Sequence, residues 1–252
     1  MSLFSDRGAS LLGADAEGTA PAGGNHKSSA TEDCYERLHA EIVQGHVMPN
    51  ERLVEADLIE SLGVSRAAVR IILARLENDG LVVRERNRGA RVRMVSESEA
   101  FEITQTRAAV ESLAAQGAAI HATDEDIAFM RGLLVEMRGY LESGDLLKYS
   151  DTNSRLHARV TAASHNQTAT RMIAELRAQL VRFQYRTVLV AGRAKNSIAE
   201  HTEIVEAIAA HDSDRAGAAM RTHLAHVAET LKETASARSQ HPPTPIEDKN
   251  SH

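Results

Sequence analysis

The stretch Leu58-Ile59-Glu60-Ser61-Leu62-Gly63-Val64-Ser65-Arg66-Ala67-Ala68-Val69-Arg70 decides the fold of this chain. It predicts a helix, a tight turn at Gly63, and a second helix that Ser65 caps and that presents Arg66 and Arg70. These arginines are four residues apart, so they lie on one face of that helix, opposite its apolar stripe. A basic helix held by a glycine turn against a scaffold helix is how helix-turn-helix proteins enter the DNA major groove.

The flanking residues complete a winged helix-turn-helix over residues 30–95. Ser29 and Glu32 have capping-box spacing, so the first helix is expected to begin near residue 30. Helices are predicted near 30–45, 55–62 and 65–78, and short strands at 81–84 and 90–93. The core stripe of the third helix is predicted to be Val69, Ile72, Leu73 and Leu76. The strands flank Asn87-Arg88-Gly89, a hairpin signal, so the predicted domain has three helices and a β-hairpin.

Arginines concentrate in this predicted domain, although the chain has a formal net charge of −6. From residue 62 to 95, three acids (77, 79, 85) stand against eight arginines, at positions 66, 70, 75, 84, 86, 88, 91 and 93. Phosphate affinity depends on the local field, so one basic surface suits a site-directed DNA binder. We expect Arg84 and Arg86 to meet the phosphate backbone, and Arg88 and Gly89 at the hairpin tip to enter the minor groove.

Composition excludes several other classes of protein. The 252 residues are 42% hydrophobic, 25% charged and 3% aromatic, which is typical of a soluble, mainly α-helical protein. No apolar run approaches the roughly 20 residues that span a bilayer, and the N-terminus lacks a secretion signal. The single cysteine, Cys34, excludes an internal disulfide framework and fits a cytoplasmic protein. Residues 1–28 and 237–252 are polar or rich in Gly, Ala, Ser and Pro, and we expect them to be disordered tails.

Between the tails, residues 97–236 predict an all-α helical bundle. Its helices are expected near 97–120, 124–142, 145–163, 167–190, 197–210 and 212–236. Their starts are marked by three pairs with capping-box spacing, Ser96 with Glu99, Thr123 with Asp126, and Ser197 with Glu200. The fold class is therefore mainly α, with a winged helix-turn-helix followed by a helical-bundle effector domain.

Histidines are the second informative feature of the chain. Asn153 and His157 are four residues apart on one predicted helix, and His201 and His223 stand beside apolar positions on two others. Converging imidazoles can share a divalent metal, although buried histidines satisfied by hydrogen bonds explain the same pattern. No HExxH pattern, nucleophile elbow or Gly-rich phosphate loop occurs in the sequence, so a metal-dependent hydrolase is not expected and we predict no enzyme.

The N-terminal motifs resemble the DNA-binding domain of GntR-family transcriptional regulators. The resemblance covers about residues 34–95 and rests on anchors that recur in order. They are Gly45-x-x-x-Pro49-x-Glu51-x-Leu53-x-Glu55-x-x-Leu58, then Leu62-Gly63-Val64-Ser65-Arg66-x-x-Val69-Arg70, then Leu76-Glu77-x-x-Gly80-Leu81-Val82, then Arg88-Gly89-Ala90-x-Val92. Asn50 stands where the family usually has Gly, and Ala67-Ala68 replace a common Thr-Pro pair.

The C-terminal motifs are similar to the helical ligand-binding domain, often called FCD, of the FadR-type subgroup of this family. The residues that carry the similarity are Asn153-x-x-x-His157, Glu200-His201-x-x-Ile204 and Met220-x-x-His223-Leu224. The resemblance implies that Asn153, His157, His201 and His223 hold a divalent metal, with zinc or nickel suited to three imidazoles. It also implies that Arg107 binds a carboxylate effector in the same cavity. An intrahelical ion pair between Arg107 and Glu111 is the alternative for that arginine.

Together, these features predict a cytoplasmic, bacterial-type transcriptional regulator. We expect a homodimer that binds double-stranded DNA at a palindromic operator and represses transcription. A small organic acid is expected to control its affinity for the DNA. Two alternatives stay open: the metal is itself the signal, or the helical domain only dimerises.

Overall fold

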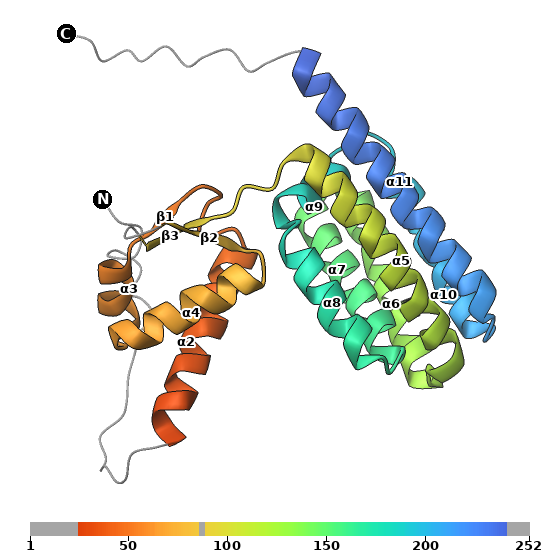
Figure 1. Ribbon diagram of the computed structural model, residues 1–252. Helices are drawn as coiled ribbons and strands as arrows, with labels where there is room; N and C mark the ends of the chain where they lie inside the picture. Colours follow the sequence, from red (N-terminus) through yellow and green to blue (C-terminus); the bar gives the residue numbers. More distant parts are fainter. Residues whose placement is uncertain (1–24, 86–88, 241–252) are drawn as a thin grey trace. The chain divides into compact units, whose positions relative to one another are not determined.

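The computed structural model describes residues 25–85 and 89–240 (Figure 1). These residues form two compact units that divide between Met94 and Val95. As predicted, the fold is mainly α-helical, with a small sheet in the N-terminal unit. Among the described residues, no helix combines the length and the apolar character needed to cross a bilayer.

The N-terminal unit is a winged helix-turn-helix, as the sequence predicts. Its elements are α2 (Asn25–Val43), β1 (Arg52–Leu53), α3 (Glu55–Leu62), α4 (Arg66–Asn78), β2 (Val82–Glu85) and β3 (Gly89–Val92). Helix α2 begins earlier than expected, so residues 25–28 are helical rather than part of a tail, and Ser29 lies inside the helix instead of capping it. Residues 1–24, where the rest of the predicted N-terminal tail falls, lie outside the described residues.

The turn and the packing of α4 follow the predicted pattern. Gly63 ends α3 with φ +65°, a left-handed conformation that glycine adopts without steric cost. The Ser65 hydroxyl accepts a hydrogen bond from the Ala68 backbone N at 3.2 Å, which caps α4. The whole predicted core stripe of α4 is buried, at Val69, Ile72, Leu73 and Leu76. Helix α4 packs on α2, α3 and β2, so its opposite face is free to present Arg66 and Arg70.

The wing is a three-stranded antiparallel sheet in the order β1-β3-β2. The β2–β3 hairpin is the predicted one, and its register pairs Val82 with Val92 and Glu85 with Gly89. Strand β1, which pairs Leu53 with Ala90, was not predicted, because two residues are too few to show an alternating pattern. This short strand anchors the base of the wing to the chain that leads into α3.

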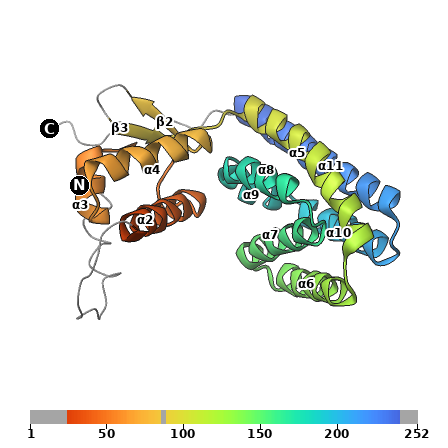
Figure 2. The ribbon, with the colours of Figure 1, turned by 60° about the horizontal axis from the view of Figure 1, so that its bottom comes forward.

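The C-terminal unit is the predicted helical bundle (Figures 1 and 2). Its helices are α5 (Glu97–His121), α6 (Asp124–Ser143), α7 (Leu146–Ala163), α8 (Gln167–Ala178), α9 (Val181–Val188), α10 (Arg193–Ala209) and α11 (Ser213–Gln240). The one helix predicted over 167–190 is two, because the chain turns at residues 179–180 without a glycine or proline to signal it. Helix α11 continues to Gln240, beyond the predicted end at 236, and residues 241–252 lie outside the described residues.

Two of the three capping boxes predicted for the bundle begin helices. The Ser96 hydroxyl accepts from the Glu99 backbone N at 3.1 Å, and Thr123 with Asp126 forms a reciprocal capping box. The third prediction was wrong. Helix α10 begins at Arg193, one turn before Ser197, so Ser197 lies inside the helix. Its hydroxyl is 3.3 Å from His201 Nδ1 and serves the site described below.

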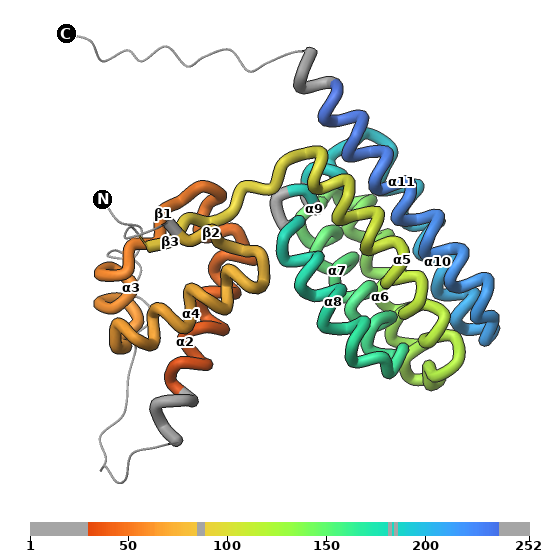
Figure 3. The backbone as a smooth tube through the Cα atoms, viewed as in Figure 1, coloured from red at the N-terminus to blue at the C-terminus, as the bar shows by residue number. Residues whose placement is uncertain are grey.

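The core of the bundle brings α7, α10 and α11 together. Helix α5 runs beside α11, as the backbone tube in Figure 3 shows, and α10 packs on α6, α11 and α5. Aliphatic residues such as Met137, Leu156, Ile204 and Leu224 fill the interior. Polar side chains on the inward faces of these helices are therefore held deep inside the domain, where three of them are histidines.

Candidate metal centre and nucleic-acid interface

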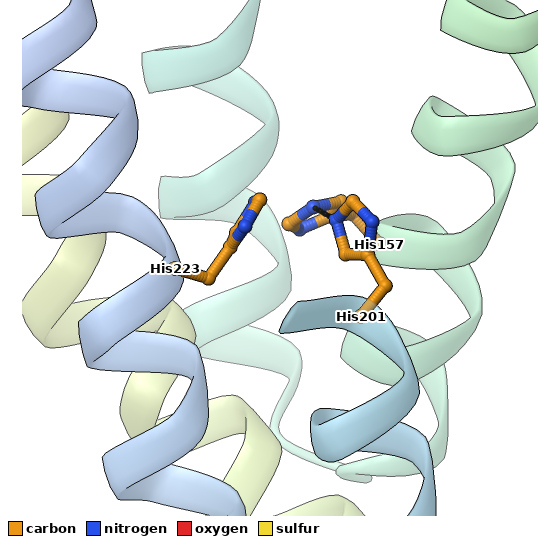
Figure 4. A group of neighbouring side chains, drawn as sticks. All are labelled: His157, His201 and His223. Carbon is orange, nitrogen blue, oxygen red and sulfur yellow. Dashed lines mark hydrogen bonds between the residues drawn. The ribbon is translucent and has the colours of Figure 1, made fainter. Parts of the chain in front are cut away.

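Three histidines from three helices meet in the bundle core. His157 lies on α7, His201 on α10 and His223 on α11, and each is at most 3% exposed. One ring nitrogen from each lies within 4.8 Å of those of the other two. Figure 4 shows the three rings facing a common point from different helices. The sequence prediction that these residues converge therefore agrees with the structure.

The other ring nitrogen of each histidine already has a partner. His157 Nδ1 donates to Glu111 Oε2 at 2.7 Å, and His223 Nδ1 donates to Glu200 Oε2 at 2.7 Å. Ser197 Oγ lies 3.3 Å from His201 Nδ1. Since Nδ1 carries the proton in neutral His157 and His223, their Nε2 atoms present lone pairs. This arrangement, in which an outer partner fixes the tautomer and ring orientation, is typical of metal-binding histidines.

The two carboxylates behind the histidines are each held by an arginine. Arg107 Nε donates to Glu111 Oε1 at 2.7 Å, and Arg193 Nη2 donates to Glu200 Oε2 at 2.9 Å. Burial alone would raise the pKa of Glu111, but the charge of Arg107 and the contact with His157 outweigh it and hold that pKa well below its usual value. For Glu200 the same balance, with burial opposing His223 and Arg193, brings the pKa to about 2. Both acids are therefore ionised near neutral pH.

The imidazoles themselves are neutral near pH 7. Burial lowers the pKa of His157 to about 4, although Glu111 partly opposes the effect. Burial also lowers the pKa of His201 well below its usual value and lowers that of His223. Neutral imidazole is the form that binds a metal. His157 Nε2 and His201 Nε2 lie 3.1 Å apart, so two lone pairs would repel here unless a proton or a cation lies between them.

The fourth residue implied by the resemblance also fits a metal site. Asn153 precedes His157 by one turn of α7, and its Oδ1 atom is buried without a hydrogen-bond partner among the described residues. An unsatisfied buried carbonyl oxygen costs free energy of roughly 1–3 kcal/mol. A neutral oxygen in this position is a suitable ligand for a divalent cation beside three imidazoles. The donor set of the chain therefore fits the group.

Arg107 forms the alternative contact that the sequence left open. Its Nε and Nη2 atoms both approach Glu111 Oε1, so the intrahelical ion pair is present. Arg107 also lines a cavity of about 70 Å³ that reaches Asn153, His157 and His223. The arginine therefore supports the carboxylate behind His157 and still faces the cavity.

Sequence reasoning missed the supporting residues of the site. Glu111 was considered only as a partner for Arg107, Glu200 as a motif residue, and Ser197 as a helix cap. A signal was available in Glu200-His201, because an acid next to a histidine on a helix can serve a histidine on another helix. His226, which follows His223 by three residues, lies at the flank of the cluster, where it is exposed and donates to Glu200 Oε1 at 2.7 Å.

The N-terminal unit presents a second candidate surface, on α4. Arg66 and Arg70 are exposed on one face of the helix, together with Ile71, which is 54% exposed. Neither arginine side chain forms a hydrogen bond or an ion pair with another residue in the part of the chain that the structure describes. Their forked donors are thus available for phosphates or for guanine edges.

The wing residues are only partly described. Arg84 is exposed on β2, whereas Arg86 and Arg88 lie outside the described residues. Gly89 begins β3 with φ +85°, and a Cβ atom there would lie 2.3 Å from the Leu53 carbonyl oxygen. Gly89 therefore allows β3 to approach β1 closely. This structural role is independent of its predicted contact with DNA.

The comparisons with known proteins divide the chain in the same way. The family described as "Bacterial regulatory proteins, gntR family" matches residues 30–92, and the family described as "FCD domain" matches residues 102–226. The chain belongs to the GntR family. Its two domains are a GntR DNA-binding head and an FCD domain.

Relatives and solved structures agree with this assignment. The Nta operon transcriptional regulator of Aminobacter aminovorans is 27% identical, over 72% of this chain and 85% of that protein. The HTH-type transcriptional repressor RspR of Escherichia coli (strain K12) is 24% identical, over 83% of this chain and 92% of that protein. The solved structure of E. coli McbR/YncC shares the fold, with a TM-score of 0.64 and 22% identity over 84% of this chain and 97% of that one. This GntR protein is a DNA-binding transcriptional regulator and not an enzyme, as the sequence predicted.

Proposed function

We propose that this GntR regulator senses a small organic acid at a metal centre in its FCD domain. Asn153, His157, His201 and His223 would hold a divalent cation, with zinc or nickel favoured by imidazole donors. The observation that carries the proposal is a group of three neutral, buried imidazoles, each with a polar partner at its Nδ1 atom. Beside them lies the amide oxygen of Asn153, which has no hydrogen-bond partner among the described residues. When bound, the cation supplies a positive centre that can bind an oxygen atom of an acid.

In this proposal Arg107 binds the carboxylate of the effector. The guanidinium has five N–H donors, and its contacts with Glu111 leave part of the fork for the cavity. A planar carboxylate matches that fork better than a hydroxyl or a neutral carbonyl does. The effector class that fits is therefore a small carboxylate.

The head would act as one half of a homodimer in the cytoplasm. Two copies of α4 would enter successive major-groove faces of a palindromic operator, with Ser65 fixing the helix start and Arg66 and Arg70 reaching the bases. Arg84 and Arg86 would contact phosphates, and Arg88 with Gly89 would enter the minor groove. The effector needs to change the affinity for DNA by on the order of 1–3 kcal/mol. We propose that the protein represses transcription and that the acid relieves this repression. The E. coli relative RspR is named a repressor.

Metal analysis of the purified protein tests the sensor half of the proposal. We expect about one metal ion per chain in the wild type, and none in a variant with alanine at positions 157, 201 and 223. His121→Ala is the matched control, because that histidine is exposed on α5 and lies outside the cluster, so this variant should keep its metal. Stoichiometric metal in the triple variant would refute the site.

Thermal shift and gel shift then separate the three possible roles of the domain. Stabilisation by carboxylates only in the presence of metal, with release of DNA from the region upstream of the gene, supports the proposal. Stabilisation and DNA release by metal alone would instead make the metal the signal. A response to neither would leave dimerisation as the role of the helical domain, and the proposal would be wrong.

A further inference from the structure

The cavity beside the histidines contains an arginine whose donors are not used. Arg193, the first residue of α10, is 8% exposed and lines the cavity. Its Nη2 atom donates to Glu200, but its Nε and Nη1 atoms are buried without a hydrogen-bond partner among the described residues. Buried N–H groups of a charged side chain are costly to leave unpaired. A hydrogen-bond acceptor in the cavity would therefore stabilise the Nε and Nη1 edge of the Arg193 guanidinium.

Arg177, near the end of α8, lines the same cavity from another side. Its guanidinium forms no hydrogen bond or ion pair with any residue in the part of the chain that the structure describes. Burial lowers the pKa of Arg177 to about 10, an effect that Glu111 opposes and Arg107 reinforces. Among the described residues, no carboxylate forms an ion pair with this second guanidinium beside the cavity.

The charges around the cavity leave an excess of positive charge. Among the described residues, three arginines line it, whereas two nearby carboxylates, Glu111 and Glu200, each already bind an arginine and a histidine. The histidines are neutral, so they do not reduce the excess. A divalent cation at the histidines would raise it further. With that cation bound, a monocarboxylate offsets one positive charge and leaves a buried excess, which is unfavourable.

We propose that the effector carries two carboxylates, and that Arg177 and Arg193 bind the second one. This inference rests on the proposed function, in which Arg107 and the metal centre take the first carboxylate. Apolar side chains, including Leu180, Phe183 and Leu224, also line the cavity and provide contacts for a short carbon chain. The cavity volume of about 70 Å³ suits a small dicarboxylate better than a long-chain acid.

Calorimetric titration of the zinc-loaded full-length protein tests the inference. The probes are malonate, succinate and glutarate, each compared with its monomethyl ester, which has nearly the same shape and one carboxylate fewer. We expect one of the diacids to bind about tenfold or more tightly than its ester, as one added charge-assisted contact implies. Equal binding of every diacid and its ester would overturn this inference alone. Binding of none of the six compounds would refute the proposed function together with it.

Two variants locate the second carboxylate. Arg177→Gln and Arg193→Gln should each remove most of the preference for the diacid. In Arg177→Gln, the affinity for the ester and the metal content should stay as in the wild type. The Arg177 side chain forms no hydrogen bond or ion pair with Glu111 or Glu200, so its variant remains informative if Arg193→Gln loses metal through Glu200. Arg138→Gln, at an exposed arginine on α6 that bonds Thr202, is the control. Equal weakening of diacid and ester in the Arg177 variant would contradict the assignment.

Discussion

Glu111→Gln is the change that tests the metal centre most directly. The carboxylate of Glu111 accepts from His157 Nδ1 through one oxygen and from Arg107 through the other. A glutamine side chain has the same shape, but one of its two ends is an N–H donor. In either orientation of the amide, a donor then faces His157 Nδ1–H or the guanidinium of Arg107. If His157 changes tautomer to relieve that contact, the proton moves to Nε2 and the lone pair that could bind a metal is lost.

Two magnitudes follow from the geometry. Removing an outer partner of a metal-binding histidine weakens metal affinity by roughly 10–100-fold. The Arg107 side chain is only 11% exposed and loses its counter-charge, and breaking a buried ion pair in this way costs roughly 3–5 kcal/mol of unfolding free energy. The variant should therefore bind metal weakly and also be less stable without metal.

Chelator competition measures the first effect, and urea unfolding of the metal-free protein measures the second. Glu136→Gln is the control, because Glu136 is 45% exposed in its ion pair with Arg155 and should change neither quantity by more than about 1 kcal/mol. Wild-type metal affinity in the Glu111 variant would refute the reasoning, since it would mean that the Nδ1 contact does not set the state of His157.

Three further predictions concern the head and the pH response. Arg66→Ala should weaken binding to the specific operator by about 1–3 kcal/mol in a gel-shift titration, because it removes a base-reading fork. Gly89→Ala should destabilise the head by at least about 1–3 kcal/mol in urea unfolding, since a Cβ atom would lie 2.3 Å from the Leu53 carbonyl oxygen. The metal-free protein should lose unfolding free energy as pH falls from 6.5 toward 4. Burial lowers the pKa of His157 to about 4, so in this pH range the unfolded chain binds a proton that the folded chain does not. At 1.36 kcal/mol per pKa unit, the loss of unfolding free energy is about 3 kcal/mol.

Each of these predictions has a matched control. Arg37→Ala, at an exposed arginine on α2, should leave operator binding nearly unchanged, and an equal loss would show that the charge of the head matters rather than the reading face. Gly63→Ala shares a positive φ but has open space around it, so a cost equal to that of Gly89→Ala would disprove the clash. His157→Gln should reduce the pH dependence by the contribution of His157, while His201 and His223, whose pKa values burial also lowers, keep theirs. An unchanged slope would assign the protons to other groups.

The sequence predicted the head in detail because its signals are local. The core stripe of α4, the cap at Ser65 and the turn at Gly63 each depend on residues within one or two helical turns. A local backbone conformation also explains why Asn50 can stand where the family usually has Gly. Its φ is +69°, the left-handed conformation for which glycine is usual and which asparagine tolerates better than other side chains.

The sequence predicted less of the supporting structure in the bundle because it depends on contacts between helices. The break between α8 and α9 has no glycine or proline, and the start of α10 at Arg193 uses Gly192 in a left-handed conformation rather than a serine cap. Spacing within α11 also could not decide which of His223 and His226 points inward. That choice depends on where α10 places Glu200, which binds one histidine through each carboxylate oxygen.

The two carboxylates make the metal residues and the cavity one connected unit. Glu111 joins Arg107 to His157, and Glu200 joins Arg193 to His223. An anion that draws either guanidinium toward the cavity weakens its hold on the carboxylate, which then accepts more strongly from the histidine and makes the imidazole a better electron-pair donor. By linkage, whatever the imidazoles bind must then change the affinity of the arginines for the anion by the same factor. The acid and the metal should therefore bind cooperatively even if they never touch.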